Sequence, residues 1–277
     1  MVASSSRATK EPQCRSWQAN AHSQPRRMNK VLGVIPARWA STRFPGKPLH
    51  LVAGKPLLQH VLERCREAKN LNSLIIATDD MRIATFAFEW GAEVALTSPR
   101  HRSGTDRVAE VAKKATKFDY IISIQGDEPL VDPHLIDKLV EKLHSDRKID
   151  IVTAAHPFEN PAEASSPHQV KVVVDASGRA LYFSRAAIPF PRSPSKIKYL
   201  RHQGIYGFRR AVLLQFVKWK TSPLERAESL EQLRALENGV KVHVLITDKG
   251  SPGIDTPQDA HALEQKLVRA QRRAFSR

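Results

Sequence analysis

Two arginines and a lysine lie close together in the segment PARWASTRFPGKPL, residues 36–49. Guanidinium groups bind phosphate oxygens in pairs, and the compact ammonium of Lys47 adds a further positive charge. Gly46 allows the backbone to approach a ligand closely. The segment lies between an apolar run and an amphipathic stretch, and loops between a strand and a helix hold phosphates on backbone amides. We therefore expect Arg38, Arg43 and Lys47 to bind a phosphorylated ligand; the alternative is a solvated basic loop.

A second polar segment, QGDEP at residues 125–129, directly follows the apolar run at residues 119–124. Asp127 and Glu128 would end a buried strand, where a carboxylate is costly unless it has a compensating partner. Mg²⁺ favours one or two carboxylates together with phosphate oxygens, so Asp127 beside a phosphate site is a natural magnesium ligand. The alternative is a simple turn, which Pro129 would suit.

An alternation of strand and helix patterns must position these segments. From Met28 to about residue 160, short apolar runs alternate with stretches of helical period. This pattern predicts a parallel sheet flanked by helices, with ligands at the carboxyl ends of the strands. The expected strands are 31–35, 73–80, 93–97, 119–124 and 150–158, and the expected helices are 57–68, 82–90, 105–115 and 135–144.

The pattern changes after about residue 160. Residues 170–185 predict a hairpin that turns at Gly178, because alternating apolar residues flank a Gly-containing turn. We interpret residues 28–265 as a single domain, in which about 160–240 form a subregion. The later elements expected are a strand at 201–208, one helix within 222–239, a strand at 241–247 and a final helix within 253–267, capped by Asp255 or Thr256.

The two ends of the chain differ from the predicted domain. Residues 1–27 are polar and basic and lack hydrophobic periodicity. Three interpretations remain open for them: an upstream start codon, since Met28 directly precedes the first strand, an organelle transit signal, or a disordered tail. Residues 266–277 are interpreted as a basic C-terminal tail.

Composition restricts the class of partner. The 277 residues carry 44 Lys and Arg against 28 Asp and Glu, a net charge of +16, which favours an anionic partner. Aromatic residues make up 6%, and no nucleic-acid recognition motif is present, so nucleic acid is disfavoured. No apolar stretch approaches a membrane span. Cys14 and Cys65 have no metal-ligand spacing and are expected to be free thiols in a reducing, cytoplasmic compartment.

Eight segments, taken in order, resemble the 3-deoxy-manno-octulosonate (Kdo) cytidylyltransferase family. They are PARWASTRFPGKPL, ATDD, SGTDR, QGDEP, ALYFSRAAIP, RHQGIYGFR, LEQLRALENG and GIDTP, between about residues 30 and 265. FSRAAIP and RHQGIYGFR separate the Kdo enzymes from other sugar-nucleotide cytidylyltransferases. Gln203 departs from the pattern, since the family usually has an apolar residue there. The resemblance implies an α/β, Rossmann-like, glycosyltransferase-A-like three-layer sandwich with a mostly parallel mixed sheet.

The resemblance also implies site residues. Arg38, Lys47, Asp127 and Asp255 would be catalytic, and Asp127 and Asp255 would bind Mg²⁺. The expected CTP-binding residues are Arg38, Ser41, Arg43, Lys47, Thr78, Ser103, Gly104, Thr105 and Gln125. The expected Kdo-binding residues are Gln125, Arg185, His202, Tyr206, Glu231 and Gln232, with Arg185 and His202 suited to the sugar carboxylate.

The family's reaction would be attack of the anomeric hydroxyl of Kdo on the α-phosphorus of CTP. It would give CMP-Kdo for lipopolysaccharide synthesis and pyrophosphate, and no covalent enzyme intermediate is expected. The resemblance further implies a cytoplasmic homodimer. Two alternatives stay open: a cytidylyltransferase for another sugar acid, such as a sialic acid, and, more remotely, a basic nucleic-acid-binding protein.

Overall fold

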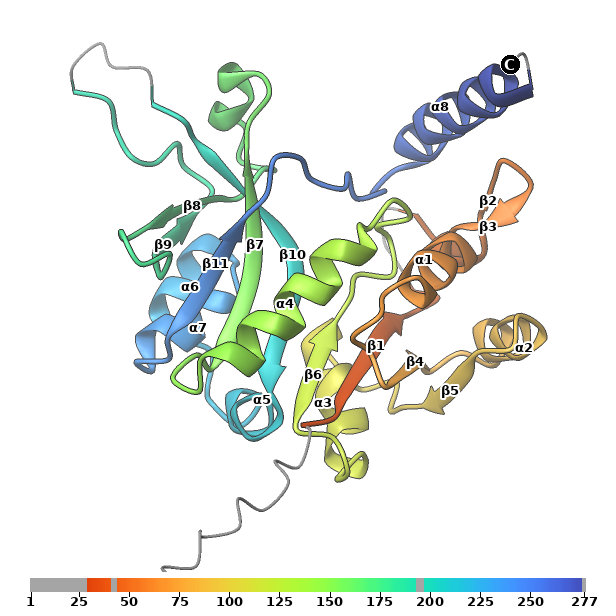
Figure 1. The fold of residues 1–277 in the computed structure, drawn as a ribbon, viewed down its shortest axis with the longest axis horizontal. Coiled ribbons are helices and arrows are strands. Elements are labelled where there is room, and N and C mark those ends of the chain that lie inside the picture. The colour runs from red at the N-terminus through yellow and green to blue at the C-terminus, as the bar shows by residue number, and fades with distance from the viewer. Residues whose placement is uncertain (1–28, 41–43, 193–196, 276–277) are drawn as a thin grey trace, which may run out of the picture.

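The computed structural model describes residues 29–40, 44–192 and 197–275, and Figure 1 shows its central mixed sheet. The main path of the sheet has the order β11-β7-β10-β6-β1-β4-β5, and β8 and β9 attach beside β10. The strands are β1 (Val31–Ala37), β4 (Ser73–Thr78), β5 (Glu93–Leu96), β6 (Tyr120–Ser123), β7 (Ile151–Pro157), β8 (Lys171–Val174), β9 (Ala180–Ser184), β10 (Leu200–Arg209) and β11 (Val242–Ile246). A separate small hairpin consists of β2 (Leu51–Val52) and β3 (Lys55–Pro56).

Helices cover both faces of the sheet. One face carries α1 (Leu57–Arg66), α2 (Met81–Glu89) and α4 (Pro133–Ser145). The other carries α3 (Gly104–Lys114), α5 (Arg210–Phe216) and α7 (Gln232–Glu237), with α6 (Pro223–Glu228) packed against α7. The predicted three-layer α/β architecture is therefore confirmed.

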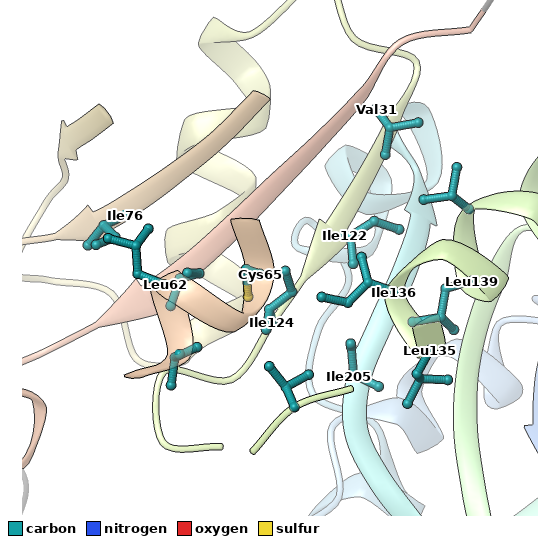
Figure 2. Packing of buried hydrophobic residues seen from close by; sticks show 14 of the residues in the cluster. Val31, Leu62, Cys65, Ile76, Ile122, Ile124, Leu135, Ile136, Leu139 and Ile205 are labelled. Atoms are coloured by element: carbon teal, nitrogen blue, oxygen red, sulfur yellow. The ribbon is translucent and has the colours of Figure 1, made fainter. Parts of the chain in front are cut away.

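Two apolar clusters separate these layers. Along β1, Val31 and Ile35 belong to the cluster under α1 and α4, whereas Leu32 and Val34 belong to the cluster under α3 and α5. Successive side chains of a strand point to opposite faces, so a strand covered on both sides is apolar throughout. Figure 2 shows part of the first cluster, in which Cys65 is a buried free thiol whose pKa is raised by burial.

The strand directions create the place for a ligand. β1 pairs in parallel with both β4 and β6, and β4 pairs in parallel with β5. β10 runs antiparallel between β6 and β7, which makes the sheet mixed, as predicted. The chain leaves β1 toward β4 on one side and reaches β6 on the other. A crevice forms outside the carboxyl ends of strands at such a switch point.

One predicted helix is wrong. Residues 222–239 form two helices, α6 and α7, separated at Ser229, whose φ of 51° is left-handed. The break lets α7 fold back, so that Arg234 forms a buried ion pair with Glu225 at 2.5 Å. Glu231 at the start of α7 accepts hydrogen bonds from α3. Local helical period could not reveal these long-range contacts.

The C-terminal helix α8 (Pro257–Phe275) lies beside the β2–β3 hairpin (Figure 1). A third apolar cluster joins Ala260 and Leu263 of α8 to Ile254, Phe44 and Val52. The helix continues beyond residue 267, so most of the segment interpreted as a basic tail is helical. None of the described helices is long and apolar enough to cross a membrane.

Candidate active site

A cleft of about 220 Å³ lies outside the carboxyl ends of β1 and β6. Both polar loops singled out in the sequence contribute to it, as does the segment that precedes α8. Its lining residues are Pro36, Ala37, Arg38, Lys47, Pro48, His101, Ser103, Gly104, Arg107, Gln125, Gly126, Asp127 and Asp255.

Lys47 is the most connected side chain of the cleft. Its Nζ lies 2.5 Å from Asp127 Oδ2 and 3.7 Å from Asp255 Oδ1, and it donates to the Ile254 carbonyl at 2.9 Å. Lys47 begins the short 3-10 helix η1 (Lys47–Leu49), and the left-handed Gly46 precedes it. The lysine thus joins three segments that are far apart in the sequence.

Gly126 allows the QGDEP turn to approach the end of β1. A Cβ at this position would lie 2.8 Å from the Pro36 carbonyl oxygen, so a larger residue would push the two strand ends apart. The Asp127 carbonyl in turn accepts from Ile254 N at 2.9 Å. These contacts bring Asp127 and Asp255 to one side of the cleft, although 128 positions separate them in the chain.

The carboxylates of Asp127 and Asp255 fit a hard cation. Both already face the positive charge of Lys47, and carboxylate oxygens are the ligands that Mg²⁺ prefers. Within the described residues, no group of three or more His, Cys, Asp or Glu side chains could hold a metal. A cation here would therefore complete its coordination with water or phosphate oxygens.

The N-terminus of α3 forms another part of the wall. Ser103 caps this helix by accepting from Asp106 N at 3.1 Å, and Gly104 follows at the first helical position. The free amides and the dipole of a helix N-terminus favour an anion. The predicted CTP residues Ser103 and Gly104 thus line the same cleft as Lys47.

Two lining residues with ionisable side chains, Arg107 and His101, were not predicted as site residues from the sequence. Arg107 is buried; its guanidinium lies 3.0 Å from Asp79 Oδ2 and donates to the Thr97 hydroxyl. His101 Nε2 lies 2.7 Å from Glu110 Oε2. The Ser98 amide, His101 and Lys114 together lower the pKa of Glu110 to about 2. Both residues are visible in the segment HRSGTDR, but only the fold turns their side chains toward the cleft.

Other predicted CTP residues lie elsewhere. Thr78 is fully buried and does not line the cleft, and its hydroxyl accepts from Asp80 N at 3.2 Å. Thr105 directs its hydroxyl to Glu231 Oε2 at 2.6 Å. Ser41 and Arg43 lie outside the described residues.

Gln125 connects the cleft to the predicted Kdo residues. Its Nε2 donates to the Gly204 carbonyl at 2.8 Å, where the pairing of β10 with β7 is irregular. Of the described residues predicted to bind Kdo, Gln125 alone lines the cleft. The others belong to β10, to α7 and to the end of β9.

His202 lies between the rings of Phe183 and Tyr206, with centroids 4.9 and 5.5 Å away. Burial lowers its pKa to about 3, so the ring is neutral and offers no ionic contact to a carboxylate. Its Nε2 lies 2.9 Å from Thr153 Oγ1, whose single proton points to the Ile205 carbonyl at 2.7 Å. This network assigns the proton to Nε2 and leaves Nδ1 as a hydrogen-bond acceptor.

Glu231 links the two predicted ligand regions. Its two carboxylate oxygens accept from Ser103 Oγ at 3.0 Å and from Thr105 Oγ1 at 2.6 Å, and burial raises its pKa. Burial and the nearby Glu231 also raise the pKa of Tyr206. Gln232 is the first residue of α7. The Glu231 carboxylate therefore forms hydrogen bonds at the α3 N-terminus and is close enough to Tyr206 for its charge to affect that hydroxyl.

Arg185 is held by main-chain carbonyl groups. Its guanidinium donates to the carbonyls of Glu228, Pro167 and Ser229 at 2.7, 2.9 and 3.3 Å. These bonds fix the break between α6 and α7 against the end of β9. The arginine thus supports the predicted Kdo region, and its contact with the sugar stays a prediction.

Gln203, the departure from the family pattern, is buried in β10. Its Nε2 lies beside Gly250 and the His156 ring, not among His202 and Tyr206. A glutamine at position 203 therefore affects how the segment before α8 packs on the sheet, and not the predicted Kdo residues.

Comparisons with known proteins agree on one family. A family model described as cytidylyltransferase matches residues 32–242. The chain is 51% identical over 231 residues to the 3-deoxy-manno-octulosonate cytidylyltransferase of Solibacter usitatus, covering 83% of this chain and 91% of the relative. It is 44% identical over 238 residues to the enzyme of that name from Fusobacterium nucleatum, covering 86% of this chain and 96% of the relative.

Solved structures show the same relationship. A CMP:2-keto-3-deoxy-manno-octonic acid synthetase complexed with CTP is 39% identical, with a TM-score of 0.84, and the match covers 87% of this chain and all of that one. A cytidylyltransferase from Leptospira borgpetersenii is 20% identical with a TM-score of 0.59, a likeness of fold alone, covering 90% of this chain and 96% of that one.

Proposed function

The chain belongs to the cytidylyltransferase family, among the 3-deoxy-manno-octulosonate cytidylyltransferases, and on that premise we propose that it converts CTP and Kdo to CMP-Kdo and pyrophosphate. The observation that carries the proposal is the cleft in which Lys47, Asp127 and Asp255 converge and which the α3 N-terminus also lines. Such a cleft combines positive charge for a triphosphate with carboxylates for a cation.

The reaction requires positioning more than a reactive side chain. The anomeric oxygen of Kdo forms a bond to the α-phosphorus, and the bond from that phosphorus to the bridging oxygen breaks. Pyrophosphate leaves with the electron pair, and the hydroxyl proton passes to solvent. Arg38 and Lys47 would neutralise charge on the departing phosphates, and the α3 amides would orient the nucleotide.

Asp127 and Asp255 would hold Mg²⁺, which supplies charge neutralisation at the phosphate oxygens and acidifies the sugar hydroxyl. In the described structure Lys47 lies against both carboxylates. Phosphate groups would draw the ammonium away and leave the carboxylates to the cation.

Kdo would bind between Gln125, which joins the cleft to β10, and the predicted residues around β10. His202 Nδ1 would accept a hydrogen bond from a sugar hydroxyl, while Arg185 is the cation that remains for the sugar carboxylate. A homodimer and a cytoplasmic location are part of the proposal. The reduced thiol of Cys65 suits a reducing compartment.

A pyrophosphate-release assay tests the proposal. With CTP and Kdo, we expect Mg²⁺-dependent release, abolished by a chelator and restored by added Mg²⁺. UTP or ATP in place of CTP, and a sialic acid in place of Kdo, should give far lower kcat/KM. Equal turnover of the sialic acid would contradict the Kdo assignment, and no turnover with any sugar acid would contradict the proposed activity.

A further inference from the structure

The segment between β11 and α8 determines the position of Asp255. It is fixed at its start, where Thr247 N donates to the Ala155 carbonyl at 2.8 Å, and near its end, where Ile254 N donates to the Asp127 carbonyl at 2.9 Å. The same end supplies two neighbours of Lys47, the Ile254 carbonyl and the Asp255 carboxylate. A shift of Ile254 and Asp255 at this end would therefore change the surroundings of Lys47.

Gly250, midway along the segment, lies directly against the sheet. A Cβ at Gly250 would be 2.3 Å from Cδ2 and Nε2 of His156 and 2.5 Å from Nε2 of Gln203. No side chain fits at such distances unless the segment or its neighbours move. Gly253, three residues later, would meet nothing within 4 Å. Neither glycine has a positive φ, so the two differ in space and not in backbone conformation.

The two side chains under Gly250 belong to neighbouring central strands. His156 is in β7, and its Nδ1 lies 2.9 Å from the Pro157 carbonyl. Gln203 is in β10, 5% exposed and paired with Ala154 of β7. Both strands are hydrogen-bonded on both sides within the sheet. The strands are therefore held in place, and a Cβ at Gly250 would meet the side-chain ends of His156 and Gln203 that rise from them.

Gln203 contributes its shape rather than its polarity. Its Oε1 is buried and, among the described residues, has no hydrogen-bond partner. An unpaired buried amide oxygen is costly, so a leucine of similar size could replace it without that cost. A residue at position 203 therefore matters to Gly250 through van der Waals contact, not through a hydrogen bond.

We propose that Gly250, packed on His156 and Gln203, is a positioning residue that sets Ile254 and Asp255 relative to Lys47 and Asp127. The consequence for ligands rests on the proposed use of CTP. The packing itself does not depend on which sugar acid is the second substrate. CTP binding can therefore be measured directly, apart from turnover.

The test compares Gly250→Ala with Gly253→Ala, the same change three residues apart. CTP affinity is measured by calorimetry with and without Mg²⁺, together with kcat, KM and the ligand-free Tm. Gly250→Ala should weaken CTP binding roughly tenfold or more, comparable to losing one bond to a charged group, with a small change in Tm. Gly253→Ala should match the wild type. Equal behaviour of the two variants would overturn the proposal.

Two further variants separate positioning from general damage. His156→Ala added to Gly250→Ala removes the ring that the new methyl would meet, and should restore most of the lost CTP affinity. Absence of this rescue would contradict the proposal. Should Gly250→Ala fail to fold, His156→Ala alone decides, since it leaves a gap under Gly250 and should weaken CTP binding several-fold; unchanged affinity would overturn the inference. Wild-type protein that binds CTP without using Kdo would refute only the proposed substrate.

Discussion

Lys47 shows how one side chain can serve both the resting cleft and the proposed reaction. With 15% of its side chain exposed, it bonds to Asp127 and to the Ile254 carbonyl. A charged hydrogen bond in such a sheltered place is stronger than one at the surface. The lysine thereby holds three segments of the cleft together.

We expect Lys47→Ala to weaken CTP use about tenfold or more, because lost bonds to charged groups cost about 1.5–3 kcal/mol each. Binding of Kdo alone should be retained. Initial rates across CTP concentrations and calorimetry with Kdo measure both quantities. Lys55→Ala, a change on the β2–β3 hairpin outside the cleft lining, is the control. Nearly unchanged kcat/KM for CTP would contradict a role of Lys47 in binding the triphosphate.

His202 gives a pH-dependent prediction for stability. Its folded pKa is about 3, whereas an unfolded histidine titrates near 6.5, so the unfolded chain binds the extra proton between these values. The stabilisation is complete above the unfolded pKa and is lost as the pH falls toward 3. At pH 4–6, His202→Gln should reduce the slope of unfolding free energy against pH by up to about 1.4 kcal/mol per pH unit.

Urea unfolding at several pH values measures this slope. His168→Gln, at an exposed histidine, is the matched control and should leave the slope unchanged. A His202→Gln slope equal to that of the wild type would show that the ring is not held neutral in the folded protein.

At the scale of elements, the break between α6 and α7 joins the predicted Kdo region to the nucleotide cleft. The buried Glu225–Arg234 pair closes the turn, and Glu231 contacts the start of α3. The side chains of Arg234 and Glu225 are 10% and 11% exposed. Removing one partner would leave the other as an uncompensated charge.

Arg234→Ala should therefore lower the unfolding free energy by about 3–5 kcal/mol. Denaturant unfolding measures the loss. Arg226→Ala, on the exposed surface of α6, removes a bond to the Thr221 carbonyl and a minor charge interaction with Glu225, and should change stability much less. If the two variants unfold alike, the buried ion pair does not hold the two helices together.

At the scale of the whole molecule, the C-terminal helix α8 packs against residues 44–53 near the start of the domain. Leu263 of α8 shares a cluster with Ile254, beside Asp255, and with Phe44, near Lys47. Ala53 N also donates to Glu264 Oε1 at 2.9 Å. Packing between segments more than 200 positions apart thus holds this side of the cleft in place.

Leu263→Ala should destabilise the protein by about 2–5 kcal/mol, as for other large-to-small core changes. It should also weaken CTP binding in the folded protein, because Ile254 loses a packing neighbour. Lys266→Ala, an exposed change on the same helix, is the control for both measurements. Lower stability with unchanged CTP affinity would show that α8 does not influence the cleft.

The sequence by itself determined the layers of the fold and two of the loops in its cleft. The strand and helix periods are local, and parallel strands place their carboxyl ends at one edge, so Lys47 and Asp127 were predicted to lie near each other. The resemblance added Asp255, which the structure brings to the same lysine.

Only the tertiary structure decided the remaining features. It broke the helix within 222–239, buried Thr78, turned Arg107 into the cleft and held His202 neutral. Each outcome depends on desolvation or on a partner distant in the sequence. Periodicity and spacing carry no information about such contacts, whereas burial and charge pairing in the folded chain determine them.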